Sequence, residues 1–494
     1  MQAIRKNIST AIVLCLLCAG SFSCKKFLEE NPKDKVSTAN YYTTPEDALN
    51  AINSAYAYLN VTSAAPFSYG VYHSDFWLTA GLASDELQND QAAAPQYGDL
   101  ATFTYNPRNA ALEEIWQMGF KTITIANIAI ERIPLISMDE TLRTRYVNEA
   151  KFIRGLLYFN LVRLFGKVPL ILHETETLYP PQANTEDVYT QIIADLTAAE
   201  ALPDEYPVGS GRGRATKWAA KGLLAKVYLT KKDFHNAATK SLEVINSGKF
   251  DLWQDYADVF KLSSRNGKEA VFSVGFGDAG GAISFWEVGQ FNVRLLPTQL
   301  SEEGVVNAQG WQSPTQQLYD SFDPDDRRRA VTFITQVKKK DGTTLTIKPY
   351  IQKYWDRVAE PTGNGSANDF PVLRYADVLL MCAEASMENG DANNAYKYIN
   401  MVRKRARYDG TTYKDILPDY AGLAPDQFRT AVLKERRMEL VCEGQRWFDL
   451  IRTGTLQTLV PQAKPGVTPS AKQIIFPIPQ REIEVNTSLK QNDY

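Results

Sequence analysis

Apolar positions recur at helical spacing through much of the chain. Their spacing of three and four residues is that of a helix with one buried face. The segments that show it are 45–59, 109–133, 139–165, 185–202, 215–231, 233–247, 372–389, 391–407 and 425–453. Short polar turns separate several neighbours, so these helices are expected to pack as antiparallel pairs. The sequence therefore predicts a mainly α protein.

Two of the predicted helix pairs are especially clear. From Ala215 to Gly248, small and aromatic residues share a stripe on the first helix, and Asp233 is placed to cap the second. The pair resembles a tetratricopeptide unit in its length and in its small residues. The second pair, 372–407, turns at Asn389 and Gly390. Because stacked pairs of this kind form a curved solenoid, we expect a tetratricopeptide-like scaffold.

Two long segments interrupt the helical pattern. One runs from about 66 to 106 and the other from about 250 to 371, which includes a strand-like run at Ala270–Val274. Loops longer than about 15 residues are uncommon unless they are functional. We interpret both segments as irregular, short-stranded binding insertions packed on one side of a rigid helical scaffold.

The N-terminus has the features of a secretory signal. Arg5 and Lys6 precede an apolar run from Ile8 to Ala19, and small residues follow up to Cys24. This run is shorter than the roughly 20 apolar residues that span a bilayer, and no later segment approaches that length. We expect residues 1–23 to be removed, Cys24 to carry a lipid anchor, and 24–40 to act as a tether.

Composition and charge exclude some classes of protein. The formal net charge is −3, and it becomes more negative when Arg5 and Lys6 leave with the signal, so no basic surface for nucleic acid is expected. Cys382 and Cys442 lie within apolar helical patterns, where small buried hydrophobic residues are expected. The chain is rich in aromatic residues, with 25 Tyr, 22 Phe and 8 Trp.

Catalytic motifs are weak. The three histidines are far apart and no paired cysteine spacing exists, so we expect no metal site. Gly275, Gly277 and Gly280 fit a dinucleotide-binding pattern, but neither an amphipathic helix nor a βαβ unit follows, and no cofactor is predicted. A glycosidase needs only two suitably spaced carboxylates, so a hydrolase stays an alternative.

Aromatic residues in the two insertions are candidates for ligand contact. A sugar ring stacks its C–H face on an aromatic plane, and its hydroxyls hydrogen-bond to neighbouring polar groups. Several aromatic side chains here have a polar neighbour in the sequence. The candidate ligand residues on this ground are Tyr97, Asp99, Trp286, Phe291 and Trp311. Aromatic residues within the helices, such as Trp116, Trp218 and Trp447, are expected to pack in the core.

Residues 425–453 combine an apolar stripe with a dense set of charges. Leu433, Leu440, Gly444, Trp447 and Ile451 form the stripe. The charged residues beside it are Glu435, Arg436, Arg437, Glu439, Glu443, Arg446 and Asp449. We expect them to form ion pairs that stabilise the packing of one continuous helix.

Several of these segments resemble the SusD/RagB family, the surface lipoproteins that pair with TonB-dependent transporters in Bacteroidetes. The matching segments are SCKKFLEENPKDKVS at 23–37, SDE at 84–86, NDFPVLRYADVLLMCAEA at 368–385, INMVRKRA at 399–406, KERRMELVCEGQRWFDLIRTG at 434–454 and FPIPQREIEVNTSLKQNDY at the terminus. They span nearly the whole chain. Asp85 of the SDE motif joins the candidate ligand residues.

The resemblance implies a single domain, 41–494. Its helical scaffold would comprise 41–249 and 372–453, with ligand-binding insertions at about 66–106 and 250–371 and an extended segment at 454–494. The ligand site would be built from 66–106 and 276–312, facing a SusC-like TonB-dependent transporter.

The resemblance implies that the protein captures an oligosaccharide or polysaccharide and hands it over to the transporter without catalysis. It also implies that a lipid on Cys24 anchors the protein to the outer membrane at the cell surface. Capture of peptides by the same fold and a protein-binding helical scaffold are the alternatives.

Overall fold

The computed structural model describes residues 42–60, 70–174, 178–206, 213–277, 289–360 and 366–493. The predicted signal (1–23), Cys24 and the tether (24–40) lie outside these ranges, as do Gly280 and Trp286. Within them, no helix combines the length and apolar character that a membrane span requires.

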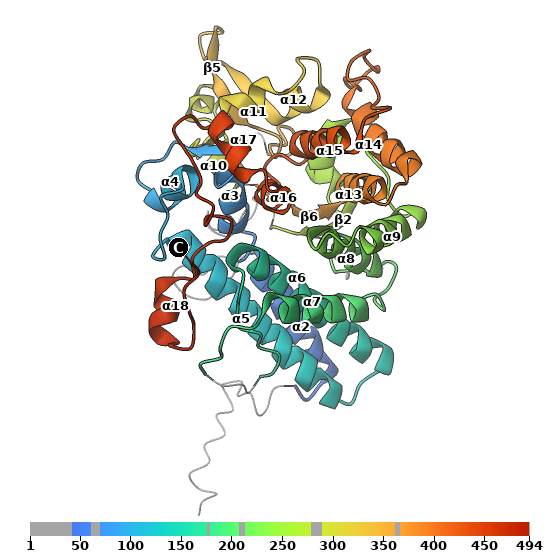
Figure 1. Cartoon of the computed structure of the whole chain (residues 1–494). Coiled ribbons are helices and arrows are strands. Elements are labelled where there is room, and N and C mark those ends of the chain that lie inside the picture. Colours follow the sequence, from blue (N-terminus) through green and yellow to red (C-terminus); the bar gives the residue numbers. More distant parts are fainter. Residues whose placement is uncertain are drawn as a thin grey trace, which may run out of the picture.

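The longer helices form a continuous stack, so the predicted mainly α scaffold is confirmed (Figure 1). Contacts link α5 to α6, α6 to α7, α7 to α8, α8 to α9, α9 to α13 and α13 to α14. The stack comprises α2 (Pro45–Asn60), α5 (Ala110–Arg132), α6 (Glu140–Phe165), α7 (Thr185–Ala199), α8 (Lys217–Thr230), α9 (Phe234–Asn246), α13 (Tyr375–Glu388) and α14 (Ala392–Ala406).

Local sequence explains where these helices begin and how closely they pack. Asp233 and Asp391 each accept a backbone N–H hydrogen bond at the first turn of the helix that follows, as expected of N-cap residues. A Cβ added at Gly155 of α6 would lie 3.1 Å from Leu196 of α7, and one at Gly119 of α5 equally close to Leu161 of α6. Small residues at these positions therefore let the helices approach.

Short strands and helices pack against this stack, most of them along the top and the left of Figure 1. The antiparallel strand pairs are β1 (Leu87–Asn89) with β3 (Gln312–Pro314), β2 (Ala270–Val274) with β6 (Phe370–Arg374), and β4 (Phe333–Lys338) with β5 (Thr344–Ile351). The short helices are α3 (Asp75–Leu82), α4 (Pro95–Thr102), α10 (Phe291–Leu295), α11 (Gln316–Asp320), α12 (Arg327–Thr332), α17 (Leu456–Ala463) and α18 (Gln480–Val485). The strand expected at 270–274 is thus confirmed.

The insertions contribute more to the core than the sequence indicated. Every residue of α3 is buried, although the sequence predicts an irregular binding insertion over this segment. Phe291 of α10 and Tyr354 belong to the same core cluster as Trp116 of α5 and Trp447. The aromatic residues of these segments therefore join the insertions to the scaffold.

The continuous helix predicted over 425–453 is wrong. Helix α15 ends at Glu439 and a separate α16 begins at Arg446. Between them Cys442 and Gly444 have φ angles of 59° and 67°, in the left-handed region that a helix cannot use. The break turns α16 (Arg446–Thr453) away from α15 (Pro425–Glu439).

The charged residues of 425–453 are locked in ion pairs, as predicted, but with partners from distant segments. Arg374 contacts Glu269, Glu439 and Glu443, each at 2.7 Å. Burial opposes ionisation of Glu439, but the surrounding guanidinium groups hold its pKa below the usual value. Removing one member of such a buried set is costly, because the remaining charges lose their compensation. Cys382 and Cys442 are both free and buried, as expected.

Candidate functional site

The pairing of β1 with β3 brings together aromatic residues that are far apart in the sequence. Asn89 of β1 lies opposite Gln312 of β3, and the two side chains are hydrogen-bonded at 3.1 Å. The backbone N–H of Asp90 donates to the carbonyl of Trp311 at 2.7 Å. Trp311 therefore lies at the end of β1, where the chain continues to α4 and Tyr97.

Arg294 of α10 joins the two aromatic residues. Its guanidinium carbon lies 5.0 Å from the ring centroid of Tyr97 and 5.3 Å from that of Trp311, within the range of a cation–π contact. The residue is only 5% exposed. Tyr97, Arg294 and Trp311 are called the aromatic–arginine cluster below.

The guanidinium of Arg294 is incompletely satisfied. One terminal nitrogen donates to the hydroxyl of Ser74 at 3.4 Å, while Nε and Nη1 are buried and have no hydrogen-bond partner among the residues described. A buried donor without an acceptor costs about 1–3 kcal/mol. This cluster is consequently a place where an added acceptor would stabilise the protein.

Tyr97 is held by a charged hydrogen bond. Its hydroxyl donates to Asp75 Oδ1 at 2.7 Å, and Asp75 also accepts from Ser74 at 3.3 Å. Burial, together with the negative charge of Asp75, raises the pKa of Tyr97 above its usual value. The ring, which is 6% exposed, is therefore neutral at physiological pH and fixed beneath Arg294.

Polar groups border the cluster along β1, β3 and β5. Lys348 of β5 is exposed and donates to Asp90 at 2.7 Å and to the Ser313 hydroxyl at 3.2 Å. Gln88 also donates to Ser313, at 3.2 Å. Half-buried Trp311 thus lies beside amide, hydroxyl, carboxylate and ammonium groups, the partners that sugar hydroxyls require.

The sequence-predicted ligand residues are only partly brought together. Tyr97 and Trp311 converge on Arg294. Asp99 is half-exposed on the same helix as Tyr97 and accepts a hydrogen bond from Thr104 at 3.1 Å, but residues two positions apart do not share a helix face. Trp286 lies outside the described residues and stays a prediction.

Phe291 and Asp85 are placed in the interior, and we no longer propose them as ligand contacts. Phe291 is 1% exposed and stacks on Tyr354 with ring centroids 3.9 Å apart. Asp85 is 2% exposed and accepts two hydrogen bonds from Arg446, at 2.7 and 2.8 Å. The SDE motif therefore connects the start of β1 to α16.

Arg294 and Lys348 were missed by the sequence analysis. Neither cation is a sequence neighbour of the aromatic residue that it accompanies, because both reach the rings and polar groups only through the fold. Arg294 follows Phe291 by one helical turn, which was the available signal. In the part of the chain that the structure describes, no group of three or more His, Cys, Asp or Glu residues is arranged to hold a metal ion.

Comparisons with known proteins agree on one family. The profile of the SusD family matches residues 334–494, and a profile described as "Starch-binding associating with outer membrane" matches residues 26–229. SusD-like protein P2 of Formosa agariphila is 30% identical, and the alignment covers 99% of both chains.

Solved structures share the fold. One, described as a laminarin binding SusD-like protein, is 26% identical with a TM-score of 0.75 and covers 92% of this chain and 100% of its own. Surface glycan-binding protein A of Bacteroides thetaiotaomicron, solved with laminarihexaose, is 22% identical with a TM-score of 0.77 and the same coverage. On the full-length match and the shared fold together, the chain belongs to the SusD family.

Proposed function

We propose that this protein captures a glycan on the aromatic–arginine cluster and passes it, uncleaved, to a TonB-dependent transporter. The observation that carries the proposal is the position of Arg294 between the rings of Tyr97 and Trp311, beside the polar groups of β1, β3 and β5. Among its relatives are a starch-binding protein and a laminarin-binding protein, which supports glycan as the cargo.

The cluster suits a sugar for three physical reasons. The half-buried ring of Trp311 offers a plane for the C–H face of a pyranose. Arg294 has unsatisfied donors that a hydroxyl or ring oxygen would accept from. Tyr97 is fixed by Asp75, so little side-chain entropy is lost on binding.

In this proposal, the N-terminal segment determines where the protein is located in the cell. Cleavage before Cys24 and lipidation there would hold the protein on the outer membrane, with the tether leading to Tyr42, the first described residue. The family profile that matches 26–229 is described as associating with the outer membrane, which supports this location. A Cys24→Ala variant should move from the membrane fraction to the soluble fraction.

Calorimetric titration of the mature protein with starch, laminarin and other polysaccharide fragments tests glycan capture. Trp311→Ala should lower the affinity for the glycan that binds by at least tenfold, about 1.4 kcal/mol. The matched control is Trp253→Ala, another half-buried tryptophan of the same insertion, which contacts Lys268 and lies outside the cluster. Equal affinity of Trp311→Ala and wild type would contradict the assignment of the site.

Handover is tested separately from binding. The protein should co-purify with a TonB-dependent transporter from the outer membrane, and Trp311→Ala should reduce glycan uptake while that association persists. No reducing ends should appear when the purified protein is incubated with its glycan. Release of reducing ends that depends on this protein would instead favour a hydrolase.

A further inference from the structure

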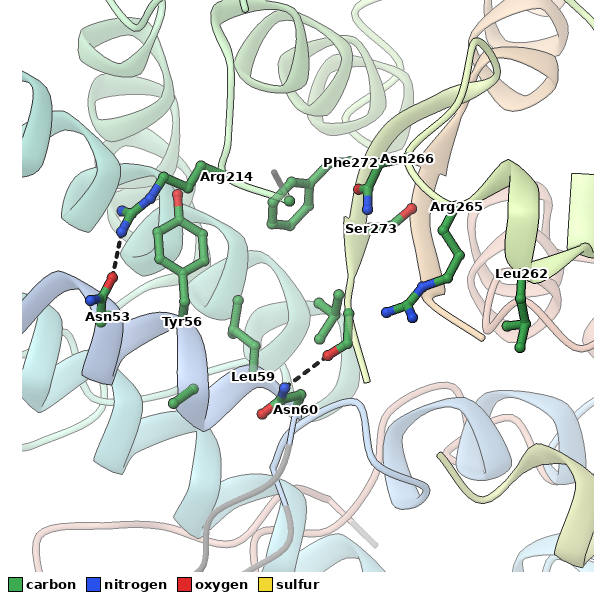
Figure 2. A pocket seen from close by; sticks show the side chains of 14 residues that line it. Asn53, Tyr56, Leu59, Asn60, Arg214, Leu262, Arg265, Asn266, Phe272 and Ser273 are labelled. Atoms are coloured by element: carbon green, nitrogen blue, oxygen red, sulfur yellow. Dashed lines mark hydrogen bonds between the residues drawn. The ribbon is translucent and has the colours of Figure 1, made fainter. Parts of the chain in front are cut away.

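A hollow lies between α2 and β2, and no residue of the aromatic–arginine cluster lines it (Figure 2). It has a volume of about 680 Å³, within the range of roughly 300–1,000 Å³ typical of small-molecule sites. A neighbouring cavity of about 540 Å³ adjoins it on the side of α8. Both cavities are lined by Gly213, Arg214, Asn266, Phe272 and Ser273, so they form one groove, called the α2–β2 groove below.

The groove combines aromatic and polar side chains. Figure 2 shows Tyr56 of α2 and Phe272 of β2 on its wall, with the amides of Asn53, Asn60 and Asn266 around them. The adjoining cavity adds further aromatic residues, Trp218 and Phe250. Trp218 Nε1 is buried and has no hydrogen-bond partner among the described residues.

The charged side chains that line the groove are already paired. Arg214 donates to Glu149 at 2.6 Å and also to Asn53, and Arg265 donates to Asp369 at 2.8 Å. In the adjoining cavity the same holds for two lysines: Lys249 contacts Glu205 at 3.3 Å, and Lys268 contacts Asp251 at 3.0 Å.

An anionic ligand would have to displace these carboxylates from their partners. A neutral ligand rich in hydroxyls could instead use the amides, the Ser273 hydroxyl and the remaining lone pairs of the paired carboxylates.

The open edge of β2 raises an extended peptide as another occupant, but its geometry argues against one. Among the described strands, β2 pairs only with β6. Its register shifts between Ala270 and Phe272 and again between Phe272 and Ser273, and such irregularities disrupt the regular row of donors and acceptors that an added strand requires. At one end, Asn60 already donates to the carbonyl of Gly275 at 2.8 Å.

We propose that the α2–β2 groove is a second carbohydrate site, which binds a neutral oligosaccharide independently of the aromatic–arginine cluster. Tyr56 and Phe272 supply apolar faces, and the asparagine amides and Ser273 supply hydrogen bonds to hydroxyls. Two sites on one molecule would let a single polysaccharide chain be held at two points, which raises the effective affinity by multivalency.

A filling substitution tests the groove with little risk to folding. Ala57 of α2 is exposed and lines the cavity, so Ala57→Trp should occupy it without disturbing the core. Asn50→Trp is the matched control, because Asn50 is also exposed, lies two turns earlier on the same helix face and does not line the cavity. Asn266→Gly removes one amide while keeping the left-handed backbone, since the φ angle of Asn266 is 50°.

The assay is calorimetric titration of the full mature protein with neutral gluco-, manno-, galacto- and xylo-oligosaccharides, in wild-type and Trp311→Ala backgrounds. For the sugar that binds, wild type should show two sites, and Trp311→Ala should retain one. Ala57→Trp should then lower the affinity of that remaining site at least tenfold, Asn266→Gly should lower it several-fold, and Asn50→Trp should leave it unchanged.

Several outcomes would overturn the proposal. The first is that Trp311→Ala binds no neutral sugar. The second is that Ala57→Trp and Asn50→Trp bind the sugar equally well in that background. The third is that the protein prefers uronate oligomers or extended peptides and that Ala57→Trp blocks their binding. A wrong assignment of the aromatic–arginine cluster would give a different result: Trp311→Ala would bind the sugar as wild type does, while Ala57→Trp alone would abolish binding.

Discussion

Asp85→Asn is the substitution that best separates a structural role from a ligand-binding one. The Asp85 carboxylate contacts Arg446 at 2.7 and 2.8 Å and Arg437 at 3.1 Å, and all three residues are buried. The amide keeps the shape of the side chain but removes its charge and places an N–H₂ group against the guanidinium groups. Two buried cations would lose their compensation, so the free energy of unfolding should fall by about 3–5 kcal/mol.

The pH dependence of that loss follows from the pKa of Asp85. Burial opposes ionisation, but the charges of Arg446 and Arg437 outweigh it and hold the pKa below its usual value of 3.8. A depressed carboxyl pKa contributes stability that is present above the unfolded pKa and lost as the pH falls through the folded pKa. In a Glu86→Gln background, in which the neighbouring Glu86 carboxyl no longer titrates, the destabilisation caused by Asp85→Asn should therefore stay constant from pH 8 to pH 5.

Urea denaturation followed by circular dichroism measures the free energy of unfolding, and glycan titration of the folded protein measures the binding affinity. Asp493→Asn is the control, because Asp493 is an exposed residue paired with Lys472, and such pairs contribute about 0–1 kcal/mol. Asp85→Asn should be strongly destabilised and, while folded, should bind glycan as wild type does. A variant of unchanged stability that has lost glycan binding would show that Asp85 contacts the ligand and is not needed for the fold.

Three further predictions concern the interior. Burial raises the pKa of Glu86 to about 7, so wild type should lose stability as the pH rises from about 4.5 to 7, and Glu86→Gln should show a weaker loss over that range in urea titrations. Gly444→Ala should destabilise more than Gly454→Ala by chemical denaturation: both have φ near 70°, but only at Gly444 would the added Cβ meet a neighbour, at 3.3 Å. Cys382 and Cys442 should resist maleimide labelling until urea unfolds the protein, because both are buried and burial raises the pKa of Cys382 to about 12; rapid native labelling would contradict the packing.

Local sequence was sufficient to predict most of the helical scaffold. Helix periodicity and caps such as Asp233 and Asp391 are encoded within a few residues, and the predicted helices match the structure to within a few positions. The break near Cys442 was missed because the apolar spacing continues across it. Its cause is tertiary: Glu443 is paired with Arg374 and Lys353, which come from distant segments.

The site was harder to predict for a similar reason. Tyr97 and Trp311 meet through β1 and β3, strands of three residues that carry almost no periodic signal. Arg294 became recognisable only when the fold placed it between the two rings. Asp85 illustrates the opposite error, since its conspicuous motif serves an ion pair with Arg446.

A crystal structure of the mature protein with a glycan that it binds would show directly where capture takes place. We expect a sugar ring stacked on Trp311, with an oxygen within hydrogen-bond distance of the Arg294 guanidinium. A glycan bound elsewhere, with Trp311 and Arg294 untouched, would contradict the assignment of the aromatic–arginine cluster as the capture site.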